Sequence, residues 1–401
     1  MNSIERRALF SLSSIYALRM LGLFMIFPVF SLYADGLEDT TPLLIGLAIS
    51  IYGLTQAILQ IPFGMLSDRF GRKPIIVIGL LLFAAGSVVA ACSTTIYGVL
   101  LGRALQGSGA IAAVIMAMAA DLTRESQRTK IMASIGASIG ASFIVAMVLG
   151  PVLSGWIGVP GMFWLIAGSS LLAIAVVIFV VPVAEQVVPV ASNRENLKIA
   201  LSNPLLLRLD FSIFLLHLLL SACFVVFPLL LRDSLQVAPS QHWLIYFPVL
   251  VGTFVCIVPL IILSEKRGKT RPLLLAAVAL MALAQLLLSG SAASLELALV
   301  GLTLFFVAFN FMEATLPSLV SKSCSPESKG ACMGVYGSSQ FFGVFAGGAL
   351  GGFLMGQFGY QMIFYVGAGA CVVWFVLLLS MSPLPVKSSP DTEDSPVSRA
   401  G

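Results

Sequence analysis

Charged residues are scarce in this chain, and their scarcity excludes a large class of proteins. Only 10% of its 401 residues are charged, whereas 59% are hydrophobic and the mean hydropathy is +1.02. Soluble globular domains carry about 25% charged residues. The composition therefore excludes a freely soluble protein and favours one that lies in a lipid bilayer.

Residues that bind metals or form disulfides are also few. The chain has two histidines and six cysteines. The cysteines are Cys92, Cys223, Cys256, Cys324, Cys332 and Cys371. They show no C-x-x-C spacing, so we interpret them as small packing residues. The sequence also has no P-loop and no convincing nucleophile–base pair. We therefore expect no enzyme activity, no metal and no cofactor, with an ion gradient such as that of protons, or the substrate itself, as the driving force.

Long apolar runs dominate what is present, and we count twelve of them. They span residues 8–33, 43–66, 74–92, 96–120, 131–154, 161–182, 208–231, 243–263, 272–290, 296–319, 332–355 and 361–382. About 18 apolar residues cross the ~30 Å hydrocarbon core of a bilayer as a helix. The runs lack strand-like alternation, and an isolated span must satisfy its own backbone hydrogen bonds. The sequence predicts an all-α membrane protein with twelve transmembrane helices, of which the first is too long for a signal-peptide core and is retained.

The basic residues alternate between the two ends of these runs. Of the 22 lysines and arginines, all but Arg19, Arg103 and Arg232 fall at the chain termini or in the even-numbered turns. Arg232 lies on the opposite side, with the acidic group at residues 35–39. The positive-inside rule then predicts that both termini are cytoplasmic. The basic pI of 8.8 reflects this topology, and we expect no nucleic-acid partner.

Two similar halves are predicted around a central hydrophilic segment. We divide the chain into an N-terminal six-helix bundle (residues 1–182), a cytoplasmic linker (183–207), a C-terminal six-helix bundle (208–382) and a disordered cytoplasmic tail (383–401). Part of the linker, around residues 197–201, could form a short interfacial helix. Repeated bundles of this kind place their binding site near the midplane, between the halves.

A polar turn is the clearest repeated motif. Its first copy reads Gly64-Met-Leu-Ser-Asp68-Arg69-Phe-Gly71-Arg72-Lys73-Pro74, and a degraded copy in residues 258–272 keeps Glu265 and Gly268. Gly64 would allow close helix packing, Asp68 could face the positive N-terminus of another helix, and Gly71 permits the turn. Simple cytoplasmic retention is the alternative, but it requires neither the acid nor the glycines.

Two further motifs lie within predicted helices. In the fourth run, Arg103 and Gln106 form an Arg-x-x-Gln-Gly pattern about 10 Å deep. A buried guanidinium normally faces a cavity or a partner, although it could instead extend to the headgroups. In the fifth run, Gly150-Pro151 is followed by Gly155, which suits close packing around a proline bend and could equally be generic packing.

Glu313 is the only carboxylate that we place well inside a predicted helix. It lies about 9 Å from the cytoplasmic end of its run, and His217 lies about 13 Å into its own, so the two could meet. Loss of water favours the neutral carboxyl, which would let Glu313 load and release a proton. Contact with a substrate cation and structural pairing are the alternatives, and His217 could be simply a packed polar residue. Arg19 aligns with His217 through the internal repeat and could also face the cavity.

Together these motifs resemble the major facilitator superfamily. The resemblance implies two pseudo-symmetric six-helix bundles, with an acidic partner segment for the polar turn at Asp121 and its neighbour Arg128. It also implies that the turn bridges the second and eleventh helices and stabilises the outward-facing state. The residues that match this conformational switch are Gly64, Asp68, Arg69, Gly71, Arg72, Asp121 and Arg128. Exposed ion pairs contribute about 1 kcal/mol or less, so the switch would bias an equilibrium.

The resemblance also implies a function. The Arg103–Gln106 pattern is linked to proton transfer in proton-coupled members, and the helix-five pattern is typical of drug–proton antiporters. Here it departs from the family at Ala146 and Ser154. The first helix and the pair His217 and Glu313 resemble the YajR-like antiporter group, whose soluble C-terminal domain we do not expect here.

We therefore expect a monomeric transporter of the bacterial inner membrane. It would export a small amphipathic compound in exchange for protons by alternating access, with the lipid bilayer as its surroundings. Uptake or facilitated movement of a metabolite or sugar on the same fold is one alternative. A transporter-like receptor that signals without transporting is another.

Overall fold

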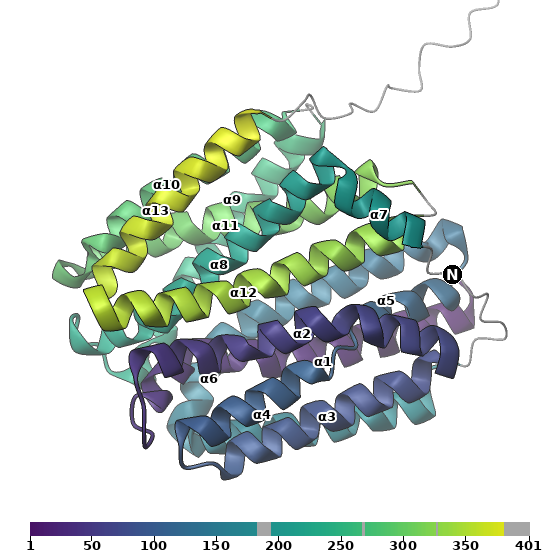
Figure 1. Cartoon of the computed structure of the whole chain (residues 1–401), viewed down its shortest axis with the longest axis horizontal. Coiled ribbons are helices and arrows are strands. Elements are labelled where there is room, and N and C mark those ends of the chain that lie inside the picture. Colours follow the sequence, from purple (N-terminus) through teal and green to yellow (C-terminus); the bar gives the residue numbers. More distant parts are fainter. Residues whose placement is uncertain (183–193, 267–268, 326–327, 381–401) are drawn as a thin grey trace, which may run out of the picture.

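The computed structural model describes residues 1–182, 194–266, 269–325 and 328–380 (Figure 1). The predicted tail at 383–401, linker residues 183–193 and Gly268 of the second polar turn lie outside the described residues. So do the side chains of Arg128 and Glu265. Within the described ranges every regular element is a helix, which confirms the all-α class.

The helices of the first half follow the predicted runs closely. They are α1 (Ser3–Ala34), α2 (Pro42–Phe70), α3 (Arg72–Cys92), α4 (Ile96–Ser108), α5 (Ala112–Asp121) and α6 (Glu125–Ala175), which ends in a π-helical turn at Val176–Val180. Asn2 begins α1 by accepting a hydrogen bond from the backbone N–H of Glu5, whose carboxylate accepts one from the Asn2 backbone. Thr41 likewise caps α2 just before Pro42, a position where proline is favoured because its missing N–H is not needed.

The second half begins with a short helix in the expected linker. Its elements are α7 (Arg194–Ser202), α8 (Pro204–Asp233), α9 (Trp243–Lys266), α10 (Thr270–Ser289), α11 (Leu295–Ser323), α12 (Lys329–Phe358) and α13 (Tyr360–Leu379). Short 3-10 turns at Pro239–Gln241 and Ser291–Ala293 precede α9 and α11. The helix α7 corresponds to the segment expected around residues 197–201.

Twelve spans emerge once two irregular places are taken into account. Eleven helical stretches in the described residues are long and apolar enough to cross a membrane, and in this count α4 and α5 are joined as one. The 51-residue helix α6 contains two of the predicted spans, joined at Gly158, whose φ of 66° is not helical. Dividing α6 there gives the expected number.

The helices α2 and α12 lie side by side along the boundary between the halves (Figure 1). Glycines make this approach possible, because a Cβ at Gly46 would clash with the carbonyl oxygen of Gly348, and one at Gly348 would lie 2.6 Å from that of Gly46. A Cβ at Gly352 would clash with the Pro42 carbonyl. We call Gly46, Gly348 and Gly352 the glycine seam.

The halves are held together at one end of the molecule. We call the end where α1 and α12 begin the basic end, at the right in Figure 1, and the opposite one the acidic end. At the acidic end Arg232 pairs with Asp35 at 2.8 Å, and Ser31 Oγ donates to the Phe224 carbonyl at 2.9 Å. Among the described residues, the polar contact between the halves that lies nearest to the basic end is a long one, from Gln60 Nε2 to the Gly334 carbonyl at 3.5 Å. Within the described ranges, the polar contacts that close the interface are therefore strongest at the acidic end and weaken toward the basic end.

Candidate functional site

Three polar side chains from three helices of the second half meet near the middle of the bundle. His217 comes from α8, Glu313 from α11 and Gln340 from α12. Gln340 Nε2 lies 2.8 Å from His217 Nε2 and 3.4 Å from Glu313 Oε1, while His217 Nε2 and Glu313 Oε2 are 3.8 Å apart. We call these residues the carboxylate cluster. The pair expected from matching depths is thus brought together, and Gln340 joins it.

The hydrogen bonds of the cluster indicate one form of the imidazole. An amide N–H of Gln340 donates, so His217 Nε2 accepts. The opposite nitrogen, Nδ1, then donates to the Ile213 carbonyl at 3.2 Å. His217 is therefore arranged as a neutral ring with its proton on Nδ1. Its side chain is 9% exposed, against 35% for that of Glu313, although the Glu313 Oε2 atom itself is buried.

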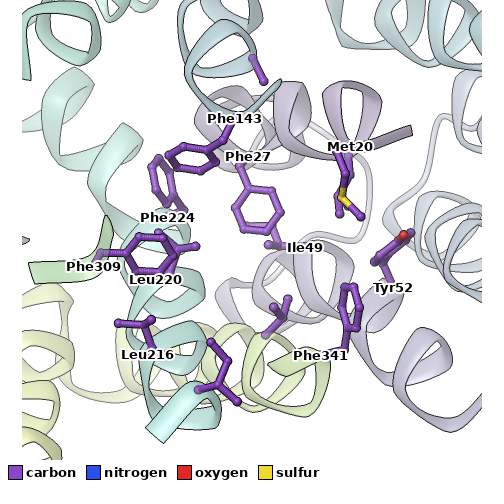
Figure 2. Close-up of a cluster of buried hydrophobic side chains, with 14 of the residues drawn as sticks. Met20, Phe27, Ile49, Tyr52, Phe143, Leu216, Leu220, Phe224, Phe309 and Phe341 are labelled. Carbon is purple, nitrogen blue, oxygen red and sulfur yellow. The ribbon is translucent and has the colours of Figure 1, made fainter. Parts of the chain in front are cut away.

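A buried group of mostly aromatic side chains from both halves (Figure 2) adjoins the cluster through Phe309. The Phe309 ring lies 5.5 Å from His217 and stacks at 6.4 Å on Phe143, which α6 supplies from the first half. The Phe27 and Phe224 rings meet edge to face at 6.0 Å. Figure 2 also labels Met20, Ile49, Tyr52, Leu216, Leu220 and Phe341 in the same buried group. The carboxylate cluster therefore adjoins a largely apolar interface.

Arg19 occupies a separate position, within the first half. Its Nη2 donates to Tyr52 Oη at 3.0 Å, Gln56 Oε1 at 2.7 Å and the Gly109 carbonyl at 2.7 Å. That carbonyl is available because the helix breaks between α4 and α5. The Arg19 side chain is 2% exposed, and its guanidinium lies 5.6 Å from the centre of the Phe83 ring. Arg19 is buried among neutral acceptors and makes no contact with His217.

Arg103 is held by backbone rather than by a carboxylate. Its guanidinium donates to the carbonyls of Ala48 and Ile49, at 3.4 and 3.2 Å, and to Gln106 Oε1 at 2.8 Å. Gln106 in turn donates to Ser87 Oγ at 2.7 Å. With 1% of Arg103 exposed, it does not extend to the headgroups. It also lies apart from the carboxylate cluster, so its link to proton transfer remains a prediction.

The polar turn forms a charged network inside the first half. Arg72 pairs with Asp68 at 2.5 Å and with Asp121 at 2.9 Å. Gly71 adopts a φ of 91°, a conformation that glycine adopts readily. Arg69 is exposed and lies against Phe70. The expected partner of Asp68 in α12 is not contacted in this structure, and the role of the turn as a switch remains a prediction.

Two glycines of the motifs do not make the close contacts that we expected. A Cβ at Gly64 or at Gly155 would meet nothing within 4 Å, so neither glycine allows a close approach in this conformation. Gly150 differs, because its Cβ would lie 2.6 Å from the Met25 carbonyl oxygen and 2.9 Å from Pro28. Pro151 is buried beside it. The helix-five motif therefore packs on α1 through Gly150.

Sequence reasoning missed several members of these networks. Gln340 lies in a glycine-rich apolar helix, where an uncharged amide is too common a residue to indicate a functional site. Glu5 forms a two-pronged ion pair with Arg124 at 2.8 and 3.0 Å. The available signal was the N-x-x-E pattern from Asn2 to Glu5 at the start of a helix, since an acid there caps the backbone.

Comparison with known proteins gives a consistent picture. The family model of the Major Facilitator Superfamily matches residues 12–238 and 209–400 of this chain. The inner membrane transport protein YajR of Escherichia coli is 47% identical over 391 residues, which cover 96% of this chain and 85% of that protein. The multidrug resistance protein MdtL of Shewanella oneidensis is 30% identical over 174 residues, 41% of this chain and 44% of that protein.

Solved structures share the fold. A bacterial homologue of the human lysosomal transporter Spinster, in an inward-facing and occupied conformation, superposes with a TM-score of 0.78 at 13% identity. The match covers 94% of this chain and 97% of that one.

Proposed function

Because this chain belongs to the Major Facilitator Superfamily, and is therefore a multi-pass membrane transporter, we propose that it exports small amphipathic compounds in exchange for protons. Glu313 is the proton carrier in this proposal. The observation that supports it most strongly is the carboxylate cluster, which places an acid beside two neutral polar groups, next to the apolar interface of the halves. The names of YajR and MdtL, an inner membrane transporter and a multidrug resistance protein, support this transport class.

Glu313 is suited to exchange a proton because no cation neutralises it permanently. Among the described residues its nearest basic group is His217, at 3.8 Å, and the hydrogen bonds above favour the neutral ring. Removal of water disfavours the charged form of a carboxylate that has no fixed cation nearby, and the group can become neutral by binding a proton. A permanent salt bridge would oppose that exchange.

A proton on Glu313 would change the contacts of α12. His217 Nε2 has one lone pair, which now accepts from Gln340. A protonated Glu313 carries an O–H that competes for the same lone pair. Proton binding would therefore release the Gln340 amide, which belongs to the helix that packs along α2. This links proton binding to the interface that must rearrange during alternating access.

We further propose that the basic end faces the cytoplasm and that both termini lie there. The positive-inside rule supports this orientation. With the acidic end closed, the structure then corresponds to an inward-facing state. The aromatic rings beside the cluster would offer apolar contacts to an amphipathic compound.

The experiment that tests the proposal measures proton movement in inverted membrane vesicles. A panel of amphipathic drugs and of metabolites is added while a pH-sensitive dye reports the vesicle interior. We expect at least one amphipathic compound to release protons from energised vesicles, and Glu313→Gln to abolish that release. Glu296→Gln is the matched control, because Glu296 lies in the first turn of the same helix, at the acidic end. Proton flux that persists in Glu313→Gln would contradict the carrier assignment, and substrate movement that ignores the proton gradient would indicate facilitated movement instead.

A further inference from the structure

A row of buried polar groups continues from the carboxylate cluster toward the basic end. Asp210 lies on α8 seven residues before His217, about 10 Å along the helix axis. Tyr336 lies on α12 four residues before Gln340, which is about one turn. Because α8 and α12 pack against each other, these residues extend the cluster on the same two helices.

Both added residues are buried without hydrogen-bond partners. Asp210 is 6% exposed and Tyr336 is 4% exposed. Within the described residues, Asp210 Oδ1, Tyr336 Oη and Glu313 Oε2 are each inaccessible and make no hydrogen bond. Buried polar atoms are normally satisfied by protein or ordered water. Three unsatisfied atoms on neighbouring helices therefore point to a shared role that packing does not explain.

Tyr336 lies near both acids. Glu313 and Asp210 both act electrostatically on its phenol, and in this conformation its hydroxyl hydrogen-bonds to neither. Asp210 makes no ion pair among the described residues. A hydroxyl that reaches two carboxyls, directly or through waters, can accept a proton from one and donate its own to the other, which an aliphatic side chain in its place could not do.

Other titratable groups lie near this row, including Arg208, two residues before Asp210 on α8. Cys324 at the end of α11 interacts with Asp210, with Cys332 and with Lys329 of α12. The helix α7 packs on both α8 and α12 but keeps its charged Glu195 and Lys198 exposed. From the first half, Tyr16 of α1 interacts electrostatically with Glu313 and also with Arg19. The helix α13 contributes a hydrogen bond from Trp374 to Ser212 and brings no charge to α8.

We propose that Asp210 and Tyr336 form the path by which protons pass between the basic end and Glu313. Asp210 takes a proton from water at the basic end. Its carboxyl O–H then transfers that proton to the Tyr336 oxygen, directly or through a water, while the phenolic proton of Tyr336 moves to the Glu313 carboxylate. Asp210 is left as a carboxylate and Tyr336 as a neutral phenol, so one proton moves and no electron changes place. This inference rests on the proposed role of Glu313 as the carrier.

The test follows the proton without any transported compound. The full chain is reconstituted in lipid nanodiscs, protons are released by a laser flash from a caged acid, and infrared absorption of protonated carboxyl groups is recorded over time. Glu313→Gln identifies the Glu313 component of the signal, and Asp210→Asn identifies that of Asp210. Tyr336→Phe removes only the relaying hydroxyl, and Tyr365→Phe, at an exposed tyrosine on α13, is its matched control.

We expect Tyr336→Phe to slow the Glu313 component at least tenfold while leaving its final amplitude unchanged. Asp210→Asn should slow it similarly, and Asp210→Glu, which restores a protonatable group, should recover most of the rate. An unchanged rate in Tyr336→Phe and Asp210→Asn would overturn the path and leave the carrier assignment intact. A signal with no Glu313 component would overturn both. Unfolding midpoints within a few degrees of the unmodified protein would show that each variant is folded.

Discussion

The glycine seam provides the sharpest quantitative prediction, because a single methyl group should change the balance between conformations. In Gly348→Ala, the added Cβ would lie 2.6 Å from the Gly46 carbonyl oxygen and would clash with Ser50. Both contacts involve the opposing helix α2, so the strain exists only while the acidic end is closed. The variant should therefore destabilise the closed acidic end relative to the state in which that end opens.

The size of the effect follows from the cost of overpacking. Adding a methylene to a tightly packed position typically costs about 1–3 kcal/mol, which corresponds to about a 5- to 150-fold change in an equilibrium constant. The backbone contact supports the upper part of this range, because a carbonyl on a helix cannot rotate away as a side chain can.

Distance measurement across the basic end checks this prediction. Spin labels are placed at Phe70, at the exposed end of α2, and at Lys329, at the start of α12, after the partly exposed cysteines are replaced by serine. We expect Gly348→Ala to shift the population toward shorter label separations, because the basic end closes as the acidic end opens. Gly330→Ala is the matched control on the same helix, since its Cβ would meet nothing within 4 Å. Identical distance distributions in Gly348→Ala and the unmodified protein would refute the reasoning.

Three further changes test individual contacts. Asp68→Asn weakens a contact to Arg72 and should slow the exchange between conformations by a few-fold, as measured by single-turnover exchange. Equilibrium binding of an identified substrate should stay nearly unchanged. Lost binding with a normal rate of exchange would contradict a switch role. Gly71→Ala forces a side chain into a backbone conformation that only glycine adopts readily, which costs about 1–3 kcal/mol. It should lower the unfolding midpoint by a few degrees, whereas Gly369→Ala, which has open space around it, should not. Gln340→Leu removes the amide shared by His217 and Glu313, and should uncouple proton release from substrate movement in the vesicle assay; tight coupling in this variant would show that Gln340 only fills space.

The positions of the helices could be predicted well from the sequence because apolarity sets them directly. Most of the runs became one helix near the expected bounds, whereas the run at 96–120 is divided between α4 and α5, and those at 131–154 and 161–182 are joined in α6. Irregular backbone was less predictable. One example is the break around Gly109, which depends on tertiary contacts such as the hydrogen bond from Arg19 to the Gly109 carbonyl. Another is the kink at Gly158 that joins two spans within α6. No local pattern specified either of them.

The candidate site was predictable only in part. Glu313 and His217 attracted attention because ionisable groups are expensive in hydrocarbon, and their similar depths indicated that they could meet. Their partner Gln340 carries no charge and so gave no comparable signal. Arg19 was expected to match His217 by internal symmetry, yet its neighbours Tyr52 and Gln56 hold it inside the first half. Pseudo-symmetry relates backbone positions, whereas side-chain partners differ between the halves.

The helix α12 connects the two features that matter most for a coupled transporter. On one face Gly348 of the seam lets it approach α2. On another face, a Cβ at Gly343 or Gly347 would clash with the carbonyls of Phe214 and Leu218 on α8, so α12 is also packed tightly against its own half. Gln340 lies one turn or less from Gly343 on this helix, which has little free space on either side. If a change in the hydrogen bonds of Gln340 rotates α12, the helix must therefore move against α2 or α8. This is a physical reason why protonation of the carboxylate cluster should change the interface between the halves.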